Sequence, residues 1–283
     1  MNILIADSGS SKTDWVWLDS NNNSRFFSSK GLNPHFLSKA EISESIADLV
    51  KTNIRDVKID QVFFYGAGSV NLSNKKILRD VFTQTFPSAK VYIETDLLAA
   101  AKACFGKSQG IVCILGTGSN TCVYDGEKII KKIPSLGFVL GDEGSGGYFG
   151  KKLLNSYYYK NMPLELREEL ESKTDMDLDY VLNRVYKHPQ ANKFVASFTE
   201  IVSAFKDHAF IKEMVREGFE DFADKQLSYF EGSRSLKIGF VGSIASVFEN
   251  ILREVLNERG LEVSIIVRNP LEKLAEYHIS QLS

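Results

Sequence analysis

Apolar and polar positions follow the periods of strands and helices through the first hundred residues. Val16 and Leu18 alternate with two tryptophans in the two-residue period of a strand, whereas the apolar residues of 41–51 and 74–86 recur at helical spacing. In chain order we expect strands at 3–6, 13–19 and 25–29, a helix at 41–51, a strand at 62–66, a helix at 74–86, a strand at 90–94 and a helix at 97–105. The first half therefore predicts a mixed α/β sheet of five strands.

The second half of the sequence repeats this order of elements. We expect strands at 111–115, 120–124 and 127–133, a long helical stretch over about 146–231, a strand at 236–241, a helix at 245–258, a strand at 261–267 and a helix at 271–278. Two similar halves predict two domains, each a five-stranded mixed sheet with helices, around a central cleft, where ligands commonly bind. The polar segment 106–110 marks the boundary between predicted domains 1–105 and 106–283, and the last helix is expected to pack back on the first domain.

Composition narrows the class of protein without identifying it. The 283 residues are 43% hydrophobic and 25% charged, with a formal net charge of -2, as in an ordinary globular protein. A net charge this close to zero predicts that the protein binds neither nucleic acid nor a membrane surface. No apolar run reaches the roughly 18 residues of a spanning helix, and the start lacks a basic leader segment, so we expect a cytoplasmic location. Cys104, Cys113 and Cys122 form no CxxC pair, which favours buried thiols in a reducing compartment.

A turn of small residues follows the first strand of each half. The turns, 7–13 and 116–121, are rich in glycine, serine and threonine. Small residues let backbone N–H groups approach an anion, and hydroxyl groups add further donors. Either turn alone is better explained as a tight hairpin, but the equivalent placement of the two turns favours a pair that faces one cleft and holds a polyphosphate from both sides.

Asp96 stands where the strand at 90–94 passes into the helix at 97–105. One interpretation is a plain helix N-cap, a position that aspartate favours. The other is a general base, because a sugar hydroxyl is a poor nucleophile and needs a group that accepts its proton during phosphoryl transfer.

Three further segments combine glycine with polar residues. Asp142 and Glu143 lie among the glycines of 137–147, as a charged turn or as carboxylates that bind vicinal sugar hydroxyls. The loop that contains Asn33 offers an amide to a ligand or simply leads into a helix. At Gly242 a strand passes into a helix, and a base or ribose could rest against a residue that has no side chain.

Three segments, in this order and spacing, carry a family resemblance. They are Thr95-Asp96-Leu97-Leu98-Ala99-Ala100, Ile114-Leu115-Gly116-Thr117-Gly118-Ser119-Asn120 and Gly141-Asp142-Glu143-Gly144-Ser145. The chain resembles, over essentially its whole length, the N-acetylglucosamine kinase and BadF/BadG/BcrA/BcrD ATPase family of the actin/hexokinase-like superfamily. That resemblance implies two ribonuclease H-like domains, with ATP and Mg²⁺ as cofactors.

The same resemblance implies roles for individual residues. Asp96 is implied as the catalytic base that activates the sugar 6-hydroxyl, and Asp7 as a residue near Mg²⁺, through its waters. The implied ATP- and phosphate-binding residues are Asp7, Gly9, Ser10, Ser11, Lys12, Thr13, Gly116, Thr117, Gly118, Gly242 and Ser243. The implied sugar-binding residues are Asn33, Asp96, Ser119, Asn120 and Asp142. The first turn departs from the family in having Ser8, Ser10 and Ser11 where glycines are common.

The sequence therefore predicts ATP-dependent phosphorylation of an amino sugar, with N-acetylglucosamine as the leading acceptor and its 6-phosphate as product. Glucosamine, N-acetylmuramic acid and N-acetylmannosamine stay open as acceptors, and a homodimer is expected because related kinases are often dimers. One alternative is an activator ATPase with an iron–sulfur cluster, for which Cys113 lies near the expected position. Another is a sugar sensor that keeps the kinase scaffold without its activity.

Overall fold

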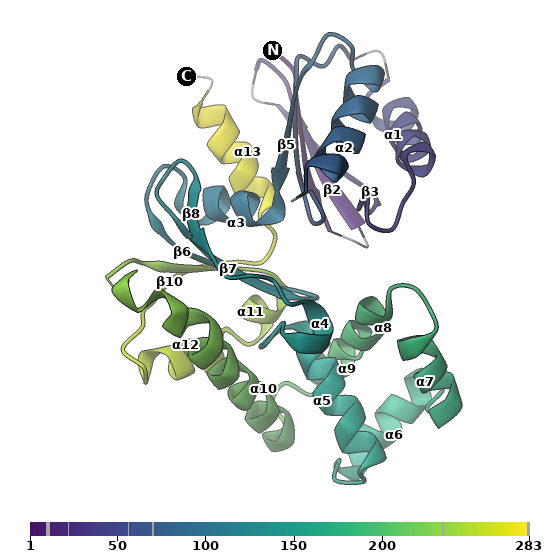
Figure 1. Cartoon of the computed structure of the whole chain (residues 1–283), viewed down its shortest axis with the longest axis vertical. Helices are drawn as coiled ribbons and strands as arrows, with labels where there is room; N and C mark the ends of the chain where they lie inside the picture. Colours follow the sequence, from purple (N-terminus) through teal and green to yellow (C-terminus); the bar gives the residue numbers. More distant parts are fainter. Residues whose placement is uncertain (10–11, 22, 56, 70, 234, 282–283) are drawn as a thin grey trace. The chain divides into compact units, whose positions relative to one another are not determined.

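The chain folds into two compact units. The computed structural model describes residues 1–281 apart from 10–11, 22, 56, 70 and 234. Unit 1 comprises Met1–Lys107 and Asn269–Ser283, and unit 2 comprises Ser108–Arg268 (Figure 1). The last helix thus belongs to the first unit, although it follows the second along the chain.

Unit 1 is built on a five-stranded mixed sheet in the order β3-β2-β1-β4-β5. Its elements are β1 (Ile3–Ser8), β2 (Lys12–Leu18), β3 (Ser24–Lys30), α1 (Lys39–Asn53), β4 (Gln61–Gly66), α2 (Leu72–Thr85), β5 (Lys90–Thr95), α3 (Asp96–Phe105) and α13 (Leu271–Ser280). The first three strands pair antiparallel, whereas β1, β4 and β5 run parallel. The carboxyl ends of these three parallel strands therefore meet at one edge of the sheet, which is where open α/β sheets bind ligands.

Helices cover both faces of this sheet because its central strand is apolar on both sides. Successive side chains of a strand point to opposite faces. Leu4 and Ala6 of β1 pack in one core with residues of α1 and α2. Ile3 and Ile5 pack in another core with α3 and α13 (Figure 1). All four side chains are buried, which explains the continuous apolar run at the start of the chain.

Unit 2 repeats the same topology. Its strands are β6 (Gly110–Leu115), β7 (Ser119–Tyr124), β8 (Ile129–Lys132), β9 (Ile238–Val241) and β10 (Val263–Val267). They form a second five-stranded sheet in the order β10-β9-β6-β7-β8, which places the first strand of the unit between the second and the fourth, as in unit 1. Strand β6 pairs antiparallel with β7 and parallel with β9.

A helical insertion lies between β8 and β9. It comprises α4 (Gly137–Leu140), α5 (Gly146–Tyr158), α6 (Leu164–Lys173), α7 (Leu178–Tyr186), α8 (Ala191–Ser197), α9 (Thr199–Ala204), α10 (Ala209–Phe222), the π-helical turn η1 (Ala223–Leu227) and the 3-10 turn η2 (Ser228–Ser233). Its aromatic side chains, among them Phe149 and Phe219, share one buried core with Ile111, Cys113 and Leu115 of β6. This core fixes the insertion against one face of the second sheet.

The helix predicted at 245–258 is wrong in one respect, because the structure has two helices there. These are α11 (Ser243–Val247) and α12 (Glu249–Asn257). Phe248 separates them with a non-helical backbone (φ -110°, ψ 29°), and its side chain is buried. The buried ring accounts for the break, because packing of Phe248 into the core overrides the helical periodicity on either side.

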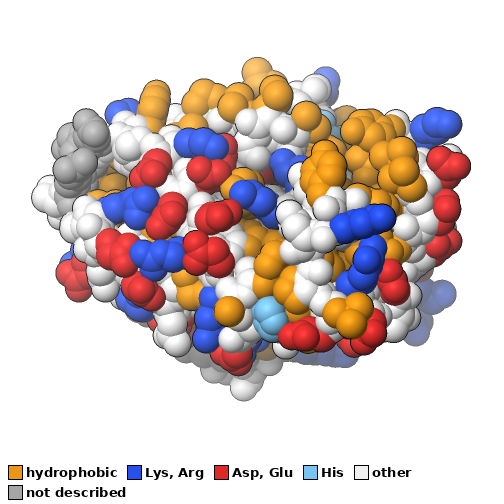
Figure 2. Space-filling model, turned by 90° about the horizontal axis from the view of Figure 1, so that it is seen from below, with side chains coloured by type: hydrophobic (Ala, Val, Ile, Leu, Met, Phe, Trp, Pro, Cys, Tyr) orange, Lys and Arg blue, Asp and Glu red, His pale blue; other side chains and the backbone are white. Residues whose placement is uncertain are grey.

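The described surface carries charges of both signs. On the face drawn in Figure 2, acidic and basic side chains intermix, and neither sign forms a continuous field. Ion pairs between helices contribute to this pattern, since Arg216 of α10 pairs with Glu220 of the same helix and with Glu254 of α12. Within the described residues, every helix is too short or too polar to cross a membrane.

Candidate functional site

The turn between β1 and β2 in unit 1 is held by its own hydroxyl groups. The hydroxyls of Ser8 and Thr13 lie 2.7 Å apart and are both buried. Ser8 Oγ also accepts the N–H of Leu32 at 3.1 Å, and the N–H of Gly9 donates to the carbonyl of Lys12 at 2.9 Å. The side chain of Thr13, predicted to bind phosphate, thus supports the turn from inside. Ser10 and Ser11 lie outside the described residues.

Lys12 directs its charge to a neighbouring carboxylate. Its Nζ lies 2.7 Å from Oδ1 of Asp14, while most of its side chain is exposed. The same Oδ1 accepts the hydroxyl of Ser28 at 2.7 Å. In this arrangement Lys12 must exchange one ion pair for another if it is to contact a phosphate.

Asp7 and Asp96 lie at the carboxyl ends of the parallel strands of unit 1. Asp7 is in β1, in register with Tyr65 of β4, which is in turn in register with Glu94 of β5, two residues before Asp96. Burial raises the pKa of Asp7 to about 7, and the negative charges of Asp96 and then Asp14 add to that rise. The register of the strands and the effect of the Asp96 charge on Asp7 together indicate that the two carboxylates lie on the same side of unit 1.

Asp96 is not the N-cap of α3, so the plain helix-cap interpretation is wrong. Thr95 is the N-cap, and its hydroxyl accepts the N–H of Leu98 at 3.2 Å. Oδ1 of Asp96 accepts the N–H of Leu97 at 2.8 Å. Burial raises the pKa of Asp96, and the hydrogen bond from Leu97 opposes that rise. A buried carboxylate of raised pKa that does not cap its helix is suited to accept a proton.

Asn33, predicted to contact sugar, belongs to the same edge of unit 1. A side chain at Gly68 would meet Oδ1 of Asn33 at 2.3 Å, and Gly68 has a positive φ of 81°, so glycine is required there. The next residue, Ser69, donates to the carbonyls of Gly66 and Glu94, each at 2.7 Å. The buried Ser69 thereby links the loop after β4, which packs against Asn33, to the carboxyl end of β5. No pattern in the sequence indicates this role of Gly68 and Ser69.

The turn between β6 and β7 in unit 2 is fastened to the start of α5. The N–H of Gly116 donates to the carbonyl of Gly118 at 3.0 Å, which closes the turn. The N–H groups of Gly146 and Gly147 donate to the carbonyls of Gly116 and Thr117 at 2.8 and 2.9 Å. These bonds occupy the carbonyl groups of the turn, and two of its three residues, Gly116 and Gly118, have no side chain, which suits close approach of an anion.

Asp142 adopts an uncommon backbone conformation beside this turn. Its φ is 59°, in the left-handed region. Residues other than glycine seldom adopt this conformation, and those that do are often found at functional sites. Its Oδ1 accepts the N–H of Ser119 at 3.2 Å. Burial raises the pKa of Asp142, while the bond from Ser119 and the charge of Lys151 oppose that rise. The hydrogen bond therefore holds the carboxylate of Asp142 against the first residue of β7.

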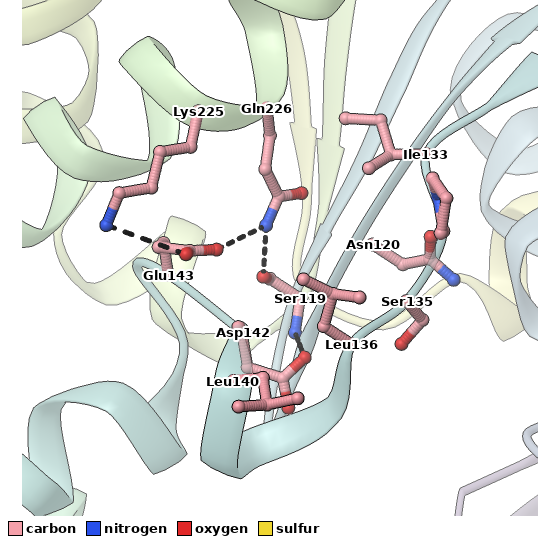
Figure 3. A pocket seen from close by; sticks show the side chains of 12 residues that line it. Ser119, Asn120, Ile133, Ser135, Leu136, Leu140, Asp142, Glu143, Lys225 and Gln226 are labelled. Atoms are coloured by element: carbon pink, nitrogen blue, oxygen red, sulfur yellow. Dashed lines mark hydrogen bonds and ion pairs between the residues drawn. The ribbon is translucent and has the colours of Figure 1, made fainter.

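A cavity of about 380 Å³ opens beside Asp142 (Figure 3). Its polar side is formed by Ser119, Asn120, Asp142, Glu143 and Gln226, and its lining is Ser119, Asn120, Ile133, Pro134, Ser135, Leu136, Leu140, Gly141, Asp142, Glu143, Lys225 and Gln226. Three predicted sugar-binding residues thus line one cavity. Sequence reasoning missed Lys225 and Gln226, which come from η1, and the apolar wall before Gly141. A cavity with one polar and one apolar side suits a sugar that carries an apolar substituent.

The predicted nucleotide segment at Gly242 lies beside the second turn. Gly242 has a φ of 127°, and a side chain there would meet the carbonyl oxygen of Leu115 at 2.2 Å. Leu115 directly precedes Gly116, so Gly242 packs on the start of the turn. Ser243 begins α11 and is exposed. Unit 2 thus brings together the predicted residues of its phosphate turn, its nucleotide segment and its sugar cavity.

The cysteines do not gather around a cofactor. Cys113 and Cys122 are buried in the second sheet, and Cys104 is half-buried on α3. Cys113 is in register with Thr121, the residue before Cys122, so these two thiols point to opposite faces of the sheet. In the part of the chain that the structure describes, no three His, Cys, Asp or Glu side chains are grouped to hold a metal ion. The described cysteines give no support to an iron–sulfur site.

The fold and the two groups of residues define a class of protein. Two mixed sheets of the same strand order, each with a small-residue turn after its first strand, form an actin/hexokinase-like fold. The glucokinase of the ROK family from Streptomyces griseus, solved with glucose and AMPPNP, has this fold, with a TM-score of 0.58 and 15% identity over all of both chains. At that identity the likeness concerns the fold alone.

More similar proteins identify the family. The crystal structure of a protein from Porphyromonas gingivalis, provisionally named an N-acetylglucosamine kinase, is 32% identical with a TM-score of 0.93, over 99% of this chain and 100% of that one. The chain belongs to this N-acetylglucosamine kinase-like family of the actin-like ATPase fold. An N-acetylmuramic acid/N-acetylglucosamine kinase from Clostridium acetobutylicum is 26% identical over 167 residues. That match covers 54% of each chain, about half the length of the curated relative. No model of a known protein family matches the sequence.

Proposed function

We propose that this protein transfers the γ-phosphoryl group of ATP to the 6-hydroxyl of an amino sugar, with N-acetylglucosamine as the leading acceptor. The observation that carries the proposal is the buried carboxylate of Asp96. It lies beside Asp7 at the ends of the parallel strands, and it does not serve as the cap of its helix. Membership of the family supports the class of substrate, because the relatives are named as kinases of N-acetylated amino sugars.

ATP and Mg²⁺ suit the residues that would hold them. The glycine-lined turn at Gly116 would donate N–H groups to phosphate oxygens, and Gly242 would leave room for the nucleoside. Asp7 shares its environment with the charges of Asp96 and Asp14, which favours a cation nearby. Mg²⁺ takes oxygen ligands and often keeps several waters beside one or two carboxylates, so Asp7 would hold it largely through water. Bound there, Mg²⁺ would neutralise charge on the transferred phosphate.

The sugar would bind in the cavity beside Asp142. Carboxylate and hydroxyl groups of Asp142 and Ser119 would accept and donate hydrogen bonds to the sugar hydroxyls, and Asn120 would add an amide. The apolar wall that includes Leu136 would contact an N-acyl substituent. Asn33 of unit 1 is proposed as a further sugar contact.

In the proposed reaction the residues position groups and move one proton. Asp96 accepts the proton of the sugar hydroxyl as its oxygen forms a bond to the γ-phosphorus. The bond from that phosphorus to the ADP oxygen breaks, and ADP leaves with the electron pair. The products are ADP, the sugar 6-phosphate and a proton that Asp96 releases to solvent.

A coupled assay of ADP release over free and N-acetylated hexosamines tests this proposal. We expect turnover that depends on both ATP and one or more amino sugars. The Asp96→Asn variant keeps the volume of the side chain and an oxygen for the N–H of Leu97, so it should fold, yet lose about 10²- to 10⁴-fold in kcat. Its nucleotide Kd, measured by calorimetry, should not change.

A matched control is Glu94→Gln, two residues earlier. Glu94 is a partly exposed carboxylate that lies 3.7 Å from Lys75, and its loss should leave kcat unchanged. Sugar-independent ATP hydrolysis together with iron and acid-labile sulfide would support the activator ATPase instead. Sugar binding without turnover would support the sensor, and a folded Asp96→Asn protein of normal kcat would remove that residue from its role.

A further inference from the structure

The side-chain amide of Gln226 joins two residues that line the cavity, Ser119 and Glu143 (Figure 3), to Thr121 of β7. Its Nε2 donates to the hydroxyl of Ser119 at 2.8 Å and to Oε2 of Glu143 at 3.1 Å. Its Oε1 accepts the hydroxyl of Thr121 at 2.9 Å. Gln226 is buried, and it follows Ser119 by 107 residues along the chain. A residue from the helical insertion therefore contacts both strand β7 and the turn that contains Asp142 and Glu143, here called the acidic turn.

The chemistry of these partners determines the orientation of the amide. A carboxylate only accepts hydrogen bonds, so the amide NH₂ must face Glu143, and the amide oxygen must face Thr121. The second N–H then points at Ser119. Ser119 Oγ accepts this bond through a lone pair, which reserves its own hydrogen for a different acceptor. Gln226 thus sets the hydroxyl of Ser119 as a donor.

The π-helical turn explains how Gln226 reaches the cavity. Single π-turns are rare and occur frequently at functional sites. In η1, Lys225 and Gln226 are consecutive, yet both approach Glu143: Nζ of Lys225 lies 3.7 Å from Oε1, and the amide of Gln226 contacts Oε2. The two oxygens of this carboxylate are therefore held from separate side chains.

We propose that Gln226 is a positioning residue for the sugar, because it orients the hydroxyl of Ser119 as a donor and the carboxylate of Glu143 as an acceptor along one wall of the cavity. Adjacent hydroxyl groups of a neutral sugar ring can accept from the first and donate to the second. The inference rests on the proposed function, and it adds the helical insertion to the elements that select the acceptor.

The variant Gln226→Glu tests the inference with almost no change of shape. Above neutral pH the new carboxylate faces Glu143 and accepts from Ser119, which turns that hydroxyl away from the sugar. We expect the sugar KM and the sugar Kd to rise about 10- to 100-fold at pH 8, with kcat and the ATP KM near the wild-type values. As pH falls, two facing carboxylates take up a proton readily, and the resulting O–H donor should restore part of the affinity.

The pH profile separates orientation from mere packing. A packing defect would raise KM equally at every pH and lower Tm, and that result would overturn the inference, as would an unchanged sugar KM. Gln84→Glu, the same change at an exposed position of α2, is the matched control and should behave as wild type.

If Gln226→Glu does not fold, Thr121→Val is the second test. This variant removes only the donor to Oε1 of Gln226 and should raise the sugar KM by a smaller factor, and an unchanged sugar KM would refute the proposal. A wild-type protein without sugar-dependent turnover would remove the proposed function and this inference together, whereas an active wild type with an unaffected Gln226→Glu variant removes the inference alone.

Discussion

Gly118 lies so close to Asp142 that a side chain at position 118 would collide with the carboxylate. A Cβ there would lie 2.8 Å from Oδ2 and 3.1 Å from Cγ of Asp142. The adjacent N–H of Ser119 donates to Oδ1 of the same carboxylate. The turn after β6 and the acidic turn therefore share one contact, which joins the proposed phosphate and sugar sites within unit 2.

Gly118→Ala should displace Asp142 and weaken sugar binding. Asp142 has little freedom to yield, because its φ of 59° and its bond from Ser119 fix the position of the carboxylate. Loss of one charge-assisted hydrogen bond predicts a rise in sugar KM of about 10- to 100-fold. Steady-state kinetics with each substrate varied checks this. Gly106→Ala offers a comparison, because nothing lies within 4 Å of its Cβ position while its φ of 57° strains an alanine, so it should lower Tm and leave the sugar KM unchanged. An equal effect on Tm from both alanines, with unaltered sugar KM, would contradict the expectation.

Asp142→Asn should reduce sugar affinity while preserving the turn. Asparagine tolerates the left-handed conformation and can still accept from the N–H of Ser119, so only the charge is lost. We expect a sugar Kd about 10-fold weaker by calorimetry, and a larger loss for Asp142→Ala. The exposed Glu262, changed to glutamine, serves as control. A sugar Kd equal to that of the wild type would exclude Asp142 from the sugar site.

The order of elements along the chain and the two small-residue turns could be predicted from the sequence because they depend on local patterns. Apolar runs and small-residue turns mark β1, β6 and the turns that follow them, and the same pattern occurs in both halves. The structure confirms two five-stranded mixed sheets. Asp96 and Asp142 could be singled out as candidates, since each stands at a point where a strand or apolar segment passes into a helix.

Contacts between distant segments could not be predicted in the same way. Gln226 meets Ser119 across 107 residues, and no periodicity of either segment indicates that bond. Gly68 is required by the amide of Asn33, which lies 35 residues earlier and belongs to another loop. Phe248 interrupts a continuous helical pattern because its ring is buried. Such features depend on packing, which a single sequence does not encode at any fixed spacing.

Asp7→Asn should stabilise the protein increasingly as pH rises. The pKa of Asp7 is about 7 in the native state, against an ordinary value of 3.8, so between these values the native state holds a proton that the unfolded state has released. Stability therefore falls as pH rises through this window and levels off above it. Asparagine is neutral throughout, so the variant should exceed wild type in Tm by about 2–8 °C at pH 8 and by less at pH 5.

Thermal unfolding of both proteins from pH 5 to pH 8 measures this difference. Asp48→Asn, at an exposed position of α1, should show no such growing advantage. We also expect Asp7→Asn to lose turnover, because residues that destabilise the fold at functional sites are retained for activity. A constant Tm difference across the range would show that Asp7 is ionised in the native state at pH 5.

His278→Gln should make the stability of unit 1 less sensitive to acid. Nε2 of His278 lies 2.9 Å from the hydroxyl of Tyr65, which also accepts a hydrogen bond from Nζ of Lys102 at 3.1 Å. Burial, and then the charge of Lys102, lower the pKa of His278 from 6.5 to about 3. Below pH 6.5 the unfolded state binds a proton that the native state does not bind. The free energy of unfolding therefore decreases as the pH is lowered, by about 2 kcal/mol at pH 5.

Glutamine does not titrate, so the Tm of His278→Gln should decline less between pH 7 and pH 5 than that of the wild type. The exposed His188, changed to glutamine, should retain the wild-type slope. Hydrogen exchange in α13 provides a second measurement: it should accelerate on acidification in wild type but much less in His278→Gln, and identical profiles would show that His278 does not hold this helix through a neutral imidazole.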